Sequence, residues 1–437
     1  MSILLSQEQK DALSIFEQWM EAEDQPFMVL AGAAGTGKTT LLRYIVQVLD
    51  ANQKLRHMID PKAKSQHLYF TATTNKAVEV LKNAVQRPTI TIHSLLGLSV
   101  KKNFQTGRED LRPKRGTEPK HFTSGLIVID EASMIGHSLF NWIRIARQES
   151  CKVLFVGDPY QLAPVLERPT EVFERVTPKV ELKEIQRQAR NSPIITASHA
   201  FRDLLRAGEA PSAQNPWPMP QSFPGVLEHL DGPAFQRALE TRYLECWKSP
   251  FDIKHDAAQR IRTLAYTNAR VLSYNAHMRQ LLGFPAEFMP GEWVITNELI
   301  EMFGTVIYPN ESLIQIQSTE PAISSDGIPG YMVYFRKGKI FQAKDPMDRI
   351  RLLKQFQKMK DWKEYFRIKA EYADLRAIHA QTCHKAQGST YDWVAVDLQD
   401  IGRNNRWQEI ARLVYVAISR AKDKVYLYGE LPYKNWQ

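Results

Sequence analysis

The stretch that decides the fold reads Gly32-Ala33-Ala34-Gly35-Thr36-Gly37-Lys38-Thr39, a complete G-x-x-x-x-G-K-[ST] pattern. Its glycines allow backbone angles that residues with a Cβ avoid, so the loop can turn its N–H groups inward around phosphate oxygens. Lys38 adds a positive charge for the same oxygens, and Thr39 adds a hydroxyl for Mg²⁺. The stretch predicts that the chain binds and hydrolyses a nucleoside triphosphate.

The residues on either side support this prediction. The apolar run 27–30 is typical of a buried strand, and residues 40–46 have apolar positions at helical spacing. A strand, a glycine-rich loop and a helix in this order place the helix N-terminus against the phosphates.

Further apolar runs predict the rest of the fold. Residues 68–72, 126–130 and 152–158 are strand-like and alternate with helical segments, which favours an α/β fold with a parallel sheet. The same pattern resumes at 264–268, followed by a helix, and again at 393–397 and 424–428. Between them, short strands at 292–295, 313–316 and 331–335 indicate a small β-rich insertion, and 345–375 looks helical and charged.

Composition restricts the class of protein. A chain of 437 residues has room for two to four domains. No apolar run approaches the roughly 18 residues that a membrane span needs, and residues 1–10 lack a signal-peptide pattern. Cys151, Cys246 and Cys383 have no metal-ligand spacing. We therefore expect a protein of a reducing compartment, without zinc and without a membrane partner.

The chain is basic, with a formal net charge of +9. This balance suits a polyanionic partner, although a basic protein without such a partner remains an alternative. Basic residues gather in two places, one between 101 and 120 and the other between 349 and 369.

Acidic and amide side chains follow the central strands. Asp130 and Glu131 end one strand, where Asp130 would hold Mg²⁺ and Glu131 would act as general base toward water. Gln161 follows the next strand and would sense a γ-phosphate or orient water. The alternatives are a solvated strand end for the acidic pair and an ordinary Asp-Pro turn for the second segment.

In this order the motifs resemble those of superfamily 1B helicases, the group that includes RecD-like and phage Dda-type enzymes. The resemblance extends from residue 7 to 422, and its motifs are the segments Gly32–Thr39, Thr71–Ala77, Thr91–Leu95, Asp130–Ser133, Gly157–Leu162, Leu182–Arg187, His379–Gly388 and Val414–Ala421. Taken alone, His93 would be an ordinary packed histidine and Arg187 a solvated helix charge; their position in the series favours the family roles.

The resemblance implies functional residues position by position. The residues at catalytic positions are Lys38, Glu131, Gln161, Arg187 and Arg420. The residues at nucleotide-binding positions are Gln9, Gly32, Ala34, Gly35, Thr36, Gly37, Lys38, Thr39, Thr40 and Gly388, and Thr39 and Asp130 are the Mg²⁺ ligands. The residues at DNA-contacting positions are Thr74, Asn75, Thr91, His93, Ser94, Asn268, Thr382, His384 and Lys385.

The resemblance also implies an architecture of two RecA-like P-loop NTPase lobes, each with an insertion. Lobe 1A would comprise 1–98 and 125–174, with a hairpin 1B at 99–124 that carries a strand-separating pin. Lobe 2A would comprise 175–285 and 376–437, with an SH3-like domain 2B and helical arm at 286–375. Phe104 or Leu111 is the candidate pin tip; alternatively both pack the hairpin base. For the aromatic stripe Trp362, Tyr365 and Phe366 we favour packing over base stacking.

The function implied is an ATP-dependent DNA helicase that moves 5′ to 3′ on single-stranded DNA and unwinds duplexes in phage-type replication or recombination. ATP and Mg²⁺ would be its cofactors, and single strands, single-strand/duplex junctions and single-strand-binding or recombination proteins its partners. We expect a monomer in a bacterial or phage-infected host cytoplasm. Three alternatives remain: an NTPase that remodels protein–DNA or RNA complexes without processive unwinding, a single-strand-binding protein with a decayed site, and a phosphate-loop kinase.

Overall fold

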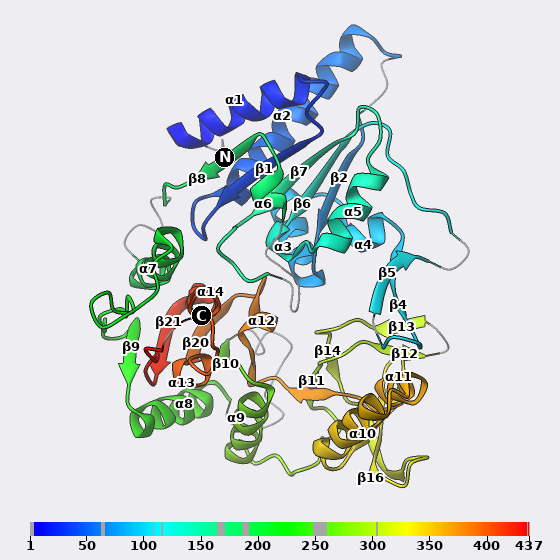
Figure 1. Ribbon diagram of the computed structural model, residues 1–437, viewed down its shortest axis with the longest axis vertical. Helices are drawn as coiled ribbons and strands as arrows, with labels where there is room; N and C mark the ends of the chain where they lie inside the picture. The colour runs from blue at the N-terminus through cyan, green and yellow to red at the C-terminus, as the bar shows by residue number, and fades with distance from the viewer. Residues whose placement is uncertain are drawn as a thin grey trace. The chain divides into compact units, whose positions relative to one another are not determined.

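The computed structural model describes residues 4–62, 66–107, 109–114, 117–163, 171–185, 192–247, 260–302, 305–434 and 436. The chain divides into two compact units (Figure 1). Unit 1 comprises 1–100 and 111–209, and unit 2 comprises 101–110 and 210–437. Among the helices in the described ranges, none is long and apolar enough to cross a membrane.

Unit 1 is built on a parallel six-stranded sheet with the strand order β3-β2-β6-β7-β1-β8. The strands are β1 (Phe27–Gly32), β2 (Leu68–Ala72), β3 (Thr89–Thr91), β6 (Leu126–Asp130), β7 (Lys152–Gly157) and β8 (Lys179–Leu182). The strands expected at 27–30, 68–72, 126–130 and 152–158 are therefore confirmed, as is the parallel sheet.

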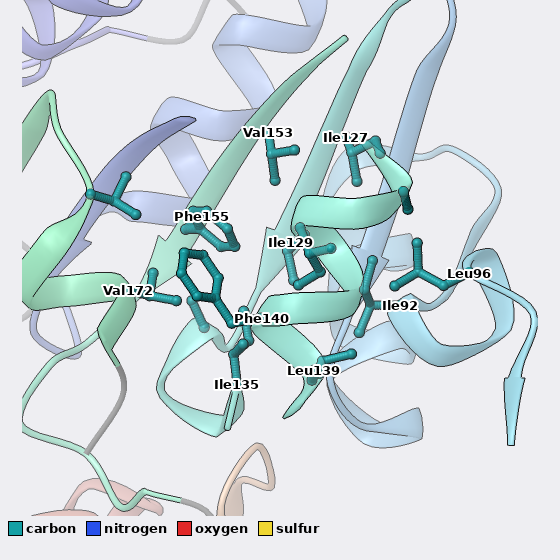
Figure 2. Packing of buried hydrophobic residues seen from close by; sticks show 14 of the residues in the cluster. Ile92, Leu96, Ile127, Ile129, Ile135, Leu139, Phe140, Val153, Phe155 and Val172 are labelled. Carbon is teal, nitrogen blue, oxygen red and sulfur yellow. The ribbon is translucent and has the colours of Figure 1, made fainter. Parts of the chain in front are cut away.

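Helices cover both faces of this sheet because the central strands are apolar on both sides. Alternate strand residues, such as Leu30 and Val128, pack against α1 (Gln7–Glu21), α2 (Lys38–Ile59) and α3 (Asn75–Val85). The intervening residues, such as Ile129 and Phe155, pack against the helices of the other face (Figure 2). These helices are α4 (Ile92–Leu95), α5 (His137–Ala146) and α6 (Glu171–Arg175).

The last elements of unit 1 correct the predicted boundary between the lobes. Strand β8 pairs in parallel with β1, with Leu30 opposite Val180, so residues 179–182 extend the first sheet. Helix α7 (Pro193–Ala207) also belongs to unit 1. The expectation that the second lobe begins at residue 175 was wrong, because the chain completes the first sheet before it enters the second unit near residue 210.

Unit 2 contains a second parallel sheet, with the strand order β19-β10-β20-β21-β9. Its strands are β9 (Leu227–Leu230), β10 (Ile261–Ala265), β19 (Ala380–Thr382), β20 (Tyr391–Asp397) and β21 (Ala421–Tyr428). Its helices are α8 (Gly232–Cys246), α9 (Asn268–Leu281), α12 (Cys383–Ala386), α13 (Leu398–Ile401) and α14 (Trp407–Ser419). Two α/β units with parallel sheets confirm the predicted pair of RecA-like lobes.

His379 lies in the core of unit 2. Its side chain is 2% exposed, packs against the rings of Tyr243 and Trp247, and its Nδ1 has no hydrogen-bond partner among the described residues. Burial, with the charges of Arg262 and Arg279, lowers the pKa of His379 to about 3. The unfolded chain therefore binds the extra proton between pH 6.5 and about 3, and the stability from the neutral ring is lost as the pH falls through this window.

We expect this histidine to make unit 2 acid-sensitive. Between pH 6.5 and 5 the free energy of unfolding should fall more steeply in the wild type than in His379→Gln, by up to about 1.4 kcal/mol per pH unit. Urea titrations at several pH values measure the difference in slope. Equal slopes for the two proteins would show that the ring does not stay neutral in the folded unit.

Residues 286–375 form small antiparallel sheets and two helices. The sheets are β14-β11-β18, β12-β13 and β15-β16-β17. Their strands are β11 (Trp293–Thr296), β12 (Ile300–Met302), β13 (Thr305–Tyr308), β14 (Leu313–Gln315), β15 (Ser318–Ile323), β16 (Pro329–Phe335), β17 (Gly338–Ala343) and β18 (Leu375–Ala377), and the helices are α10 (Pro346–Met359) and α11 (Trp362–Glu371). An SH3-like arrangement of these strands remains a prediction.

The basic segment after residue 98 forms a hairpin of β4 (Leu98–Lys102) and β5 (Glu109–Pro113). Its tip, 101–110, belongs to unit 2, where Phe104 meets the ring of Phe366 edge-on at 5.5 Å. Leu111 instead packs against the core of unit 1, and its carbonyl accepts a hydrogen bond from Trp142. Leu111 as pin tip was therefore wrong, because it lies at the hairpin base; Phe104 as pin tip remains a prediction.

Candidate active site

The phosphate loop connects β1 to α2, as its sequence predicts. Gly35 and Gly37 have φ angles of 80° and 81°, and Gly37 is the N-cap of α2. Only glycine takes this left-handed conformation without strain, so these two positions shape the loop. The loop N–H groups and the N-terminus of a 22-residue helix thus lie together at the end of β1.

Gly32 is required for a different reason, which is close packing. A Cβ at this position would lie 2.6 Å from Thr36 Oγ1 and 3.0 Å from the carbonyl oxygen of Leu182. Thr36 is fully buried and donates its hydroxyl hydrogen to the carbonyl of Ala33 at 2.9 Å. The loop is therefore held from inside by its own threonine and bounded on one side by β8.

The Lys38 ammonium lies over this loop and donates to the carbonyls of Gly32 at 2.6 Å and Ala33 at 2.9 Å. Burial lowers the pKa of Lys38, while the carboxylates of Asp158, Asp130 and Glu131 raise it. One cation and three carboxylates thus share one site at the carboxyl ends of β1, β6 and β7.

Gln9 ties α1 to the same loop. Its Nε2 donates to the carbonyl of Gly37 at 3.2 Å, and its Oε1 accepts from the backbone N–H of Ser6 in a capping box. The side chain is 1% exposed. Of the other predicted nucleotide contacts in this unit, Thr39 and Thr40 are exposed on the first turn of α2.

The acidic pair lies at the end of β6. Asp130 Oδ1 accepts the N–H of Glu131 at 2.8 Å, and Glu131 has a left-handed φ of 54°. Burial and the Glu131 carboxylate raise the pKa of Asp130 to about 7. The two crowded carboxylates and the exposed Thr39 hydroxyl on the first turn of α2 are oxygen donors of the kind that Mg²⁺ takes.

A magnesium ion here would need further ligands. Across the described ranges, no group of three or more His, Cys, Asp or Glu side chains could hold a metal alone. Mg²⁺ commonly takes one or two protein oxygens and completes its shell with phosphates and water. The residues present fit that pattern, with Asp130 and Thr39 as the protein ligands.

The segment after β7 adds Asp158 and Gln161. Asp158 is fully buried and its Oδ1 accepts the N–H of Tyr160 at 3.0 Å. The N–H of Gln161 donates to the carbonyl of Asp158 at 3.2 Å, and the Gln161 side chain is 6% exposed. The turn thus brings Asp158 close enough to act on Lys38, a role that the sequence did not predict.

Sequence reasoning also missed two residues of α7. His199 Nε2 lies 3.2 Å from the carbonyl of Ala34 in the phosphate loop, and burial lowers the pKa of His199. Arg202 is 4% exposed, donates to Glu181 at 2.8 Å and lies 5.2 Å from the ring of Tyr160. Histidine and arginine within an otherwise apolar helical segment could have suggested a functional role. No spacing in the sequence, however, connected these residues with the phosphate loop.

Arg202 is placed to position the groups around Lys38, whose pKa its charge lowers. Its Nε is buried without a hydrogen-bond partner in the described part of the chain. We expect Arg202→Ala to lower the rate of ATP hydrolysis about tenfold and the free energy of unfolding by about 2 kcal/mol, because Glu181 loses its partner. Hydrolysis assays and urea titrations measure both.

A paired variant separates the two effects. Arg202→Met combined with Glu181→Gln removes both charges, so stability should return to within about 1 kcal/mol of the wild type. The hydrolysis defect should persist. Recovery of hydrolysis together with stability would show that Arg202 serves the fold alone.

The predicted DNA-contacting residues of unit 1 occupy helix starts after β2 and β3. The hydroxyl of Thr74 caps α3 by accepting from the N–H of Ala77, and Asn75 is the first residue of that helix. Thr91 caps α4 by accepting from the N–H of Ser94. Burial lowers the pKa of His93, so its ring is held neutral. The two segments follow β2 and β3, which are neighbouring strands of the same sheet.

The corresponding residues of unit 2 show the same arrangement. Thr382 caps α12 after β19, and Asn268 begins α9 after the neighbouring β10. Lys385 Nζ donates to the backbone and side-chain oxygens of Asn297, both at 2.6 Å, and His384 lies 3.3 Å from Glu409. In each unit, two neighbouring strands are therefore each followed by a helix that a threonine caps or that begins with an asparagine.

The remaining predicted nucleotide residues of unit 2 are Gly388 and Arg420. Gly388 follows α12 with a φ of 75°. Arg420 is the C-cap of α14, is 7% exposed, and donates to the carbonyl of Val416 and to Ser419. Arg187, the other predicted arginine, lies outside the described residues.

Two family models match the chain. Residues 4–214 match one described as an AAA domain, and residues 377–428 match one described as a UvrD-like helicase C-terminal domain. The first match covers the phosphate loop and the whole of α7, and the second covers unit 2 from β19 to β21.

Curated relatives match almost the whole chain. The ATP-dependent DNA helicase dda of Enterobacteria phage T4 is 23% identical over 97% of this chain and 98% of its own length. Over nearly its whole length, the chain is similar to an ATP-dependent DNA helicase. The ATP-dependent RecD2 DNA helicase of Deinococcus radiodurans is 26% identical over 92% of this chain, which spans 47% of that protein. Among solved structures, the Pif1 helicase from Bacteroides with ADP-AlF3 and ssDNA has a TM-score of 0.48 at 16% identity, covering 99% of this chain and 94% of that chain.

This similarity fits the order of the motifs along the chain. The phosphate loop, the acidic pair after β6 and the segment after β7 lie in unit 1, and the segments 379–388 and 414–421 lie in unit 2. Nucleotide-binding and hydrolytic roles of individual residues go beyond this relationship and form part of the proposal below.

Proposed function

We propose that the protein is an ATP-driven DNA helicase that moves 5′ to 3′ along single-stranded DNA and separates duplex strands. The observation that carries the proposal is the grouping of Lys38 with Asp158, Asp130 and Glu131 at the phosphate loop. This grouping suits hydrolysis of a nucleoside triphosphate, and the similarity to two ATP-dependent DNA helicases supports DNA as the track. The 5′ to 3′ direction is proposed from the motif resemblance alone.

Nucleotide binding would use the phosphate loop as it is folded. The Lys38 ammonium would exchange its carbonyl partners, Gly32 and Ala33, for phosphate oxygens of higher charge. Thr39 and Asp130 would hold Mg²⁺, which supplies positive charge against the phosphate oxygens. Gln9, whose side chain donates to the carbonyl of Gly37, would contact the adenine edge.

Hydrolysis would use Glu131 as the general base toward a water molecule, with Gln161 orienting that water. Arg420 and Arg187 would stabilise the charge on the transferred phosphoryl group through their planar forks. Gly388 would let the backbone of unit 2 approach the nucleotide. Hydrolysis would be coupled to movement along the strand.

DNA contact would use the helix starts of both sheets. Threonine hydroxyls, helix N–H groups and the amides of Asn75 and Asn268 contact phosphates and sugars without reading bases. Such contacts suit a motor that moves along any sequence. His93, Ser94, His384 and Lys385 would complete them.

The test is hydrolysis of ATP by the purified chain with and without single-stranded DNA. We expect a single strand of about 20 nucleotides to raise the rate at least tenfold. A rate that DNA does not change would contradict a DNA motor. Hydrolysis that DNA stimulates, without displacement of a strand from any tailed duplex, would instead favour remodelling of protein–DNA or RNA complexes.

A further inference from the structure

The basic residues of the second segment, 349–369, divide into two groups in the structure. The first group, which comprises the three arginines and Lys369, has acidic partners. Arg349 is 6% exposed and donates to Glu298 at 2.5 Å. Arg367 contacts Asp326 at 2.5 Å, Glu364 at 2.6 Å and Glu371 at 2.7 Å, and Lys369 pairs with Glu109 at 2.9 Å. These charges serve the fold of unit 2.

The other group is exposed and has no acidic partner. It comprises Lys354, Lys358, Lys360 and Lys363, which we call the lysine face. In the part of the chain that the structure describes, none of the four ammonium groups lies within 4.0 Å of a carboxylate. Ammonium groups that form no ion pair within the described chain are available to bind a negatively charged partner.

The helix pair explains why these lysines point outward. Leu352, Leu353 and Phe356 of α10 pack against the core that includes Ile368 of α11 and Tyr372. The two helices lie side by side in Figure 1, in gold. Lys354 and Lys358 are four residues apart on the opposite side of α10, about 6 Å apart along its axis. Lys360 is the C-cap of α10 and Lys363 lies in the first turn of α11, so the other two lysines lie at the turn between the two helices.

The arm offers cations without exposed aromatic rings. Trp362 packs edge-on against Tyr365 at 5.6 Å, and Tyr365 against Phe366 at 5.4 Å. Among the described residues of α10 and α11, every aromatic side chain is buried or half-buried. Binding of a single strand without sequence preference relies on rings that stack on bases, whereas a duplex presents a dense, fixed array of phosphates.

We propose that the lysine face binds the phosphate backbone of duplex DNA, independently of sequence. The proposal rests on the proposed function, because it supplies the duplex-holding element of a motor that works at single-strand/duplex junctions. The face reads charge and spacing only, so it would hold a duplex of any sequence while the phosphate-loop cycle acts on the single strand.

The experiment compares the full chain with two variants of equal charge change. One variant changes all four residues of the lysine face to Gln, which keeps helix propensity. The matched control changes four exposed lysines of unit 1 to Gln: Lys10, Lys54, Lys62 and Lys82. Fluorescence anisotropy measures the binding of a blunt 20-base-pair duplex and of a 12-nucleotide dT strand between 50 and 200 mM NaCl.

For the lysine-face variant we expect the slope of log K against log salt on the duplex to fall in magnitude by about 3. Its duplex affinity should fall at least about tenfold, with dT affinity and single-strand-stimulated hydrolysis within about twofold of the wild type. The control should keep the wild-type slope to within about 1. A double variant with Lys354→Gln and Lys358→Gln should give about half of the slope change. It tests the same lysine face with fewer substitutions, and therefore with less risk of unfolding the protein.

Three results would overturn the proposal: an unchanged duplex slope, an equal loss in the control variant, or an equal loss of single-strand affinity. The last would make the face a single-strand site. Failure of the proposed function would show elsewhere, in a wild-type hydrolysis rate that DNA does not raise, and would leave the duplex measurement as a separate test.

Discussion

Lys38→Ala should lower the rate of ATP hydrolysis by about a hundredfold to a thousandfold, and the loss should be the same with or without DNA. The Lys38 ammonium is the cation that lies over the phosphate loop, surrounded by the fields of Asp158, Asp130 and Glu131. Removing one charge-stabilising group from a preorganised site typically costs two to three orders of magnitude in rate. Steady-state hydrolysis at saturating ATP measures the effect.

The control is Lys10→Ala, which removes an exposed lysine from α1 and should leave the rate within about twofold. Lys38 also donates to the carbonyls of Gly32 and Ala33, so a thermal melt of Lys38→Ala checks that unit 1 remains folded. A folded Lys38→Ala protein that keeps more than a tenth of the wild-type rate would show that the loop does not bind the hydrolysed phosphate.

Arg420→Ala should lower kcat by about a thousandfold while changing nucleotide affinity less than about threefold. An arginine that stabilises charge on a transferred phosphoryl group acts mainly in the transition state, where such residues contribute about 10³ to 10⁵ in rate. In unit 2 the Arg420 side chain donates to the carbonyls of Val416 at 3.2 Å and Ser389 at 3.4 Å. Nucleotide binding by fluorescence and hydrolysis by product release measure the two quantities.

Those carbonyl contacts also allow a purely structural role for Arg420, and two further variants distinguish the roles. Arg420→Lys keeps the charge but loses the planar fork, so it should retain the fold without restoring the rate. Arg237→Ala removes an exposed arginine of α8 and should leave kcat unchanged. If Arg420→Ala lowers only the melting temperature, or if the lysine variant restores kcat, the arginine does not contact the phosphoryl group.

The parts of the fold that follow local rules could be predicted from sequence. The phosphate loop needs glycine at fixed positions, and the apolar strands ending at Asp130 and Gly157 are long enough to be recognised alone. Helices alternate with these strands along the chain and carry it back across the sheet, so the strands run parallel to one another. Because Asp130 and Glu131 come at the end of β6, their position at this edge of the sheet could also be predicted from the sequence.

The parts that depend on contacts between distant segments could not be predicted. Strand β8 has only four residues, and its place beside β1 comes from pairing with a strand 150 residues earlier in the sequence. His199 approaches the loop because α7 packs there, and a lone histidine in a helix carries no such signal. Leu111 and Phe104 lie seven residues apart, yet Leu111 packs into unit 1 and Phe104 packs against α11 of unit 2. Their spacing in the sequence could not show which of them lies at the base of the hairpin and which at its tip.

The central claim is that ATP hydrolysis at the phosphate loop drives movement along one strand in one direction. Its most direct test is strand displacement on two duplexes that differ only in the end carrying a single-stranded tail, with ATP and Mg²⁺ and with Lys38→Ala as the inactive control. We predict displacement from the duplex with a 5′ tail and little from the duplex with a 3′ tail. Displacement from the 3′-tailed duplex alone, or equal displacement by Lys38→Ala, would contradict the account.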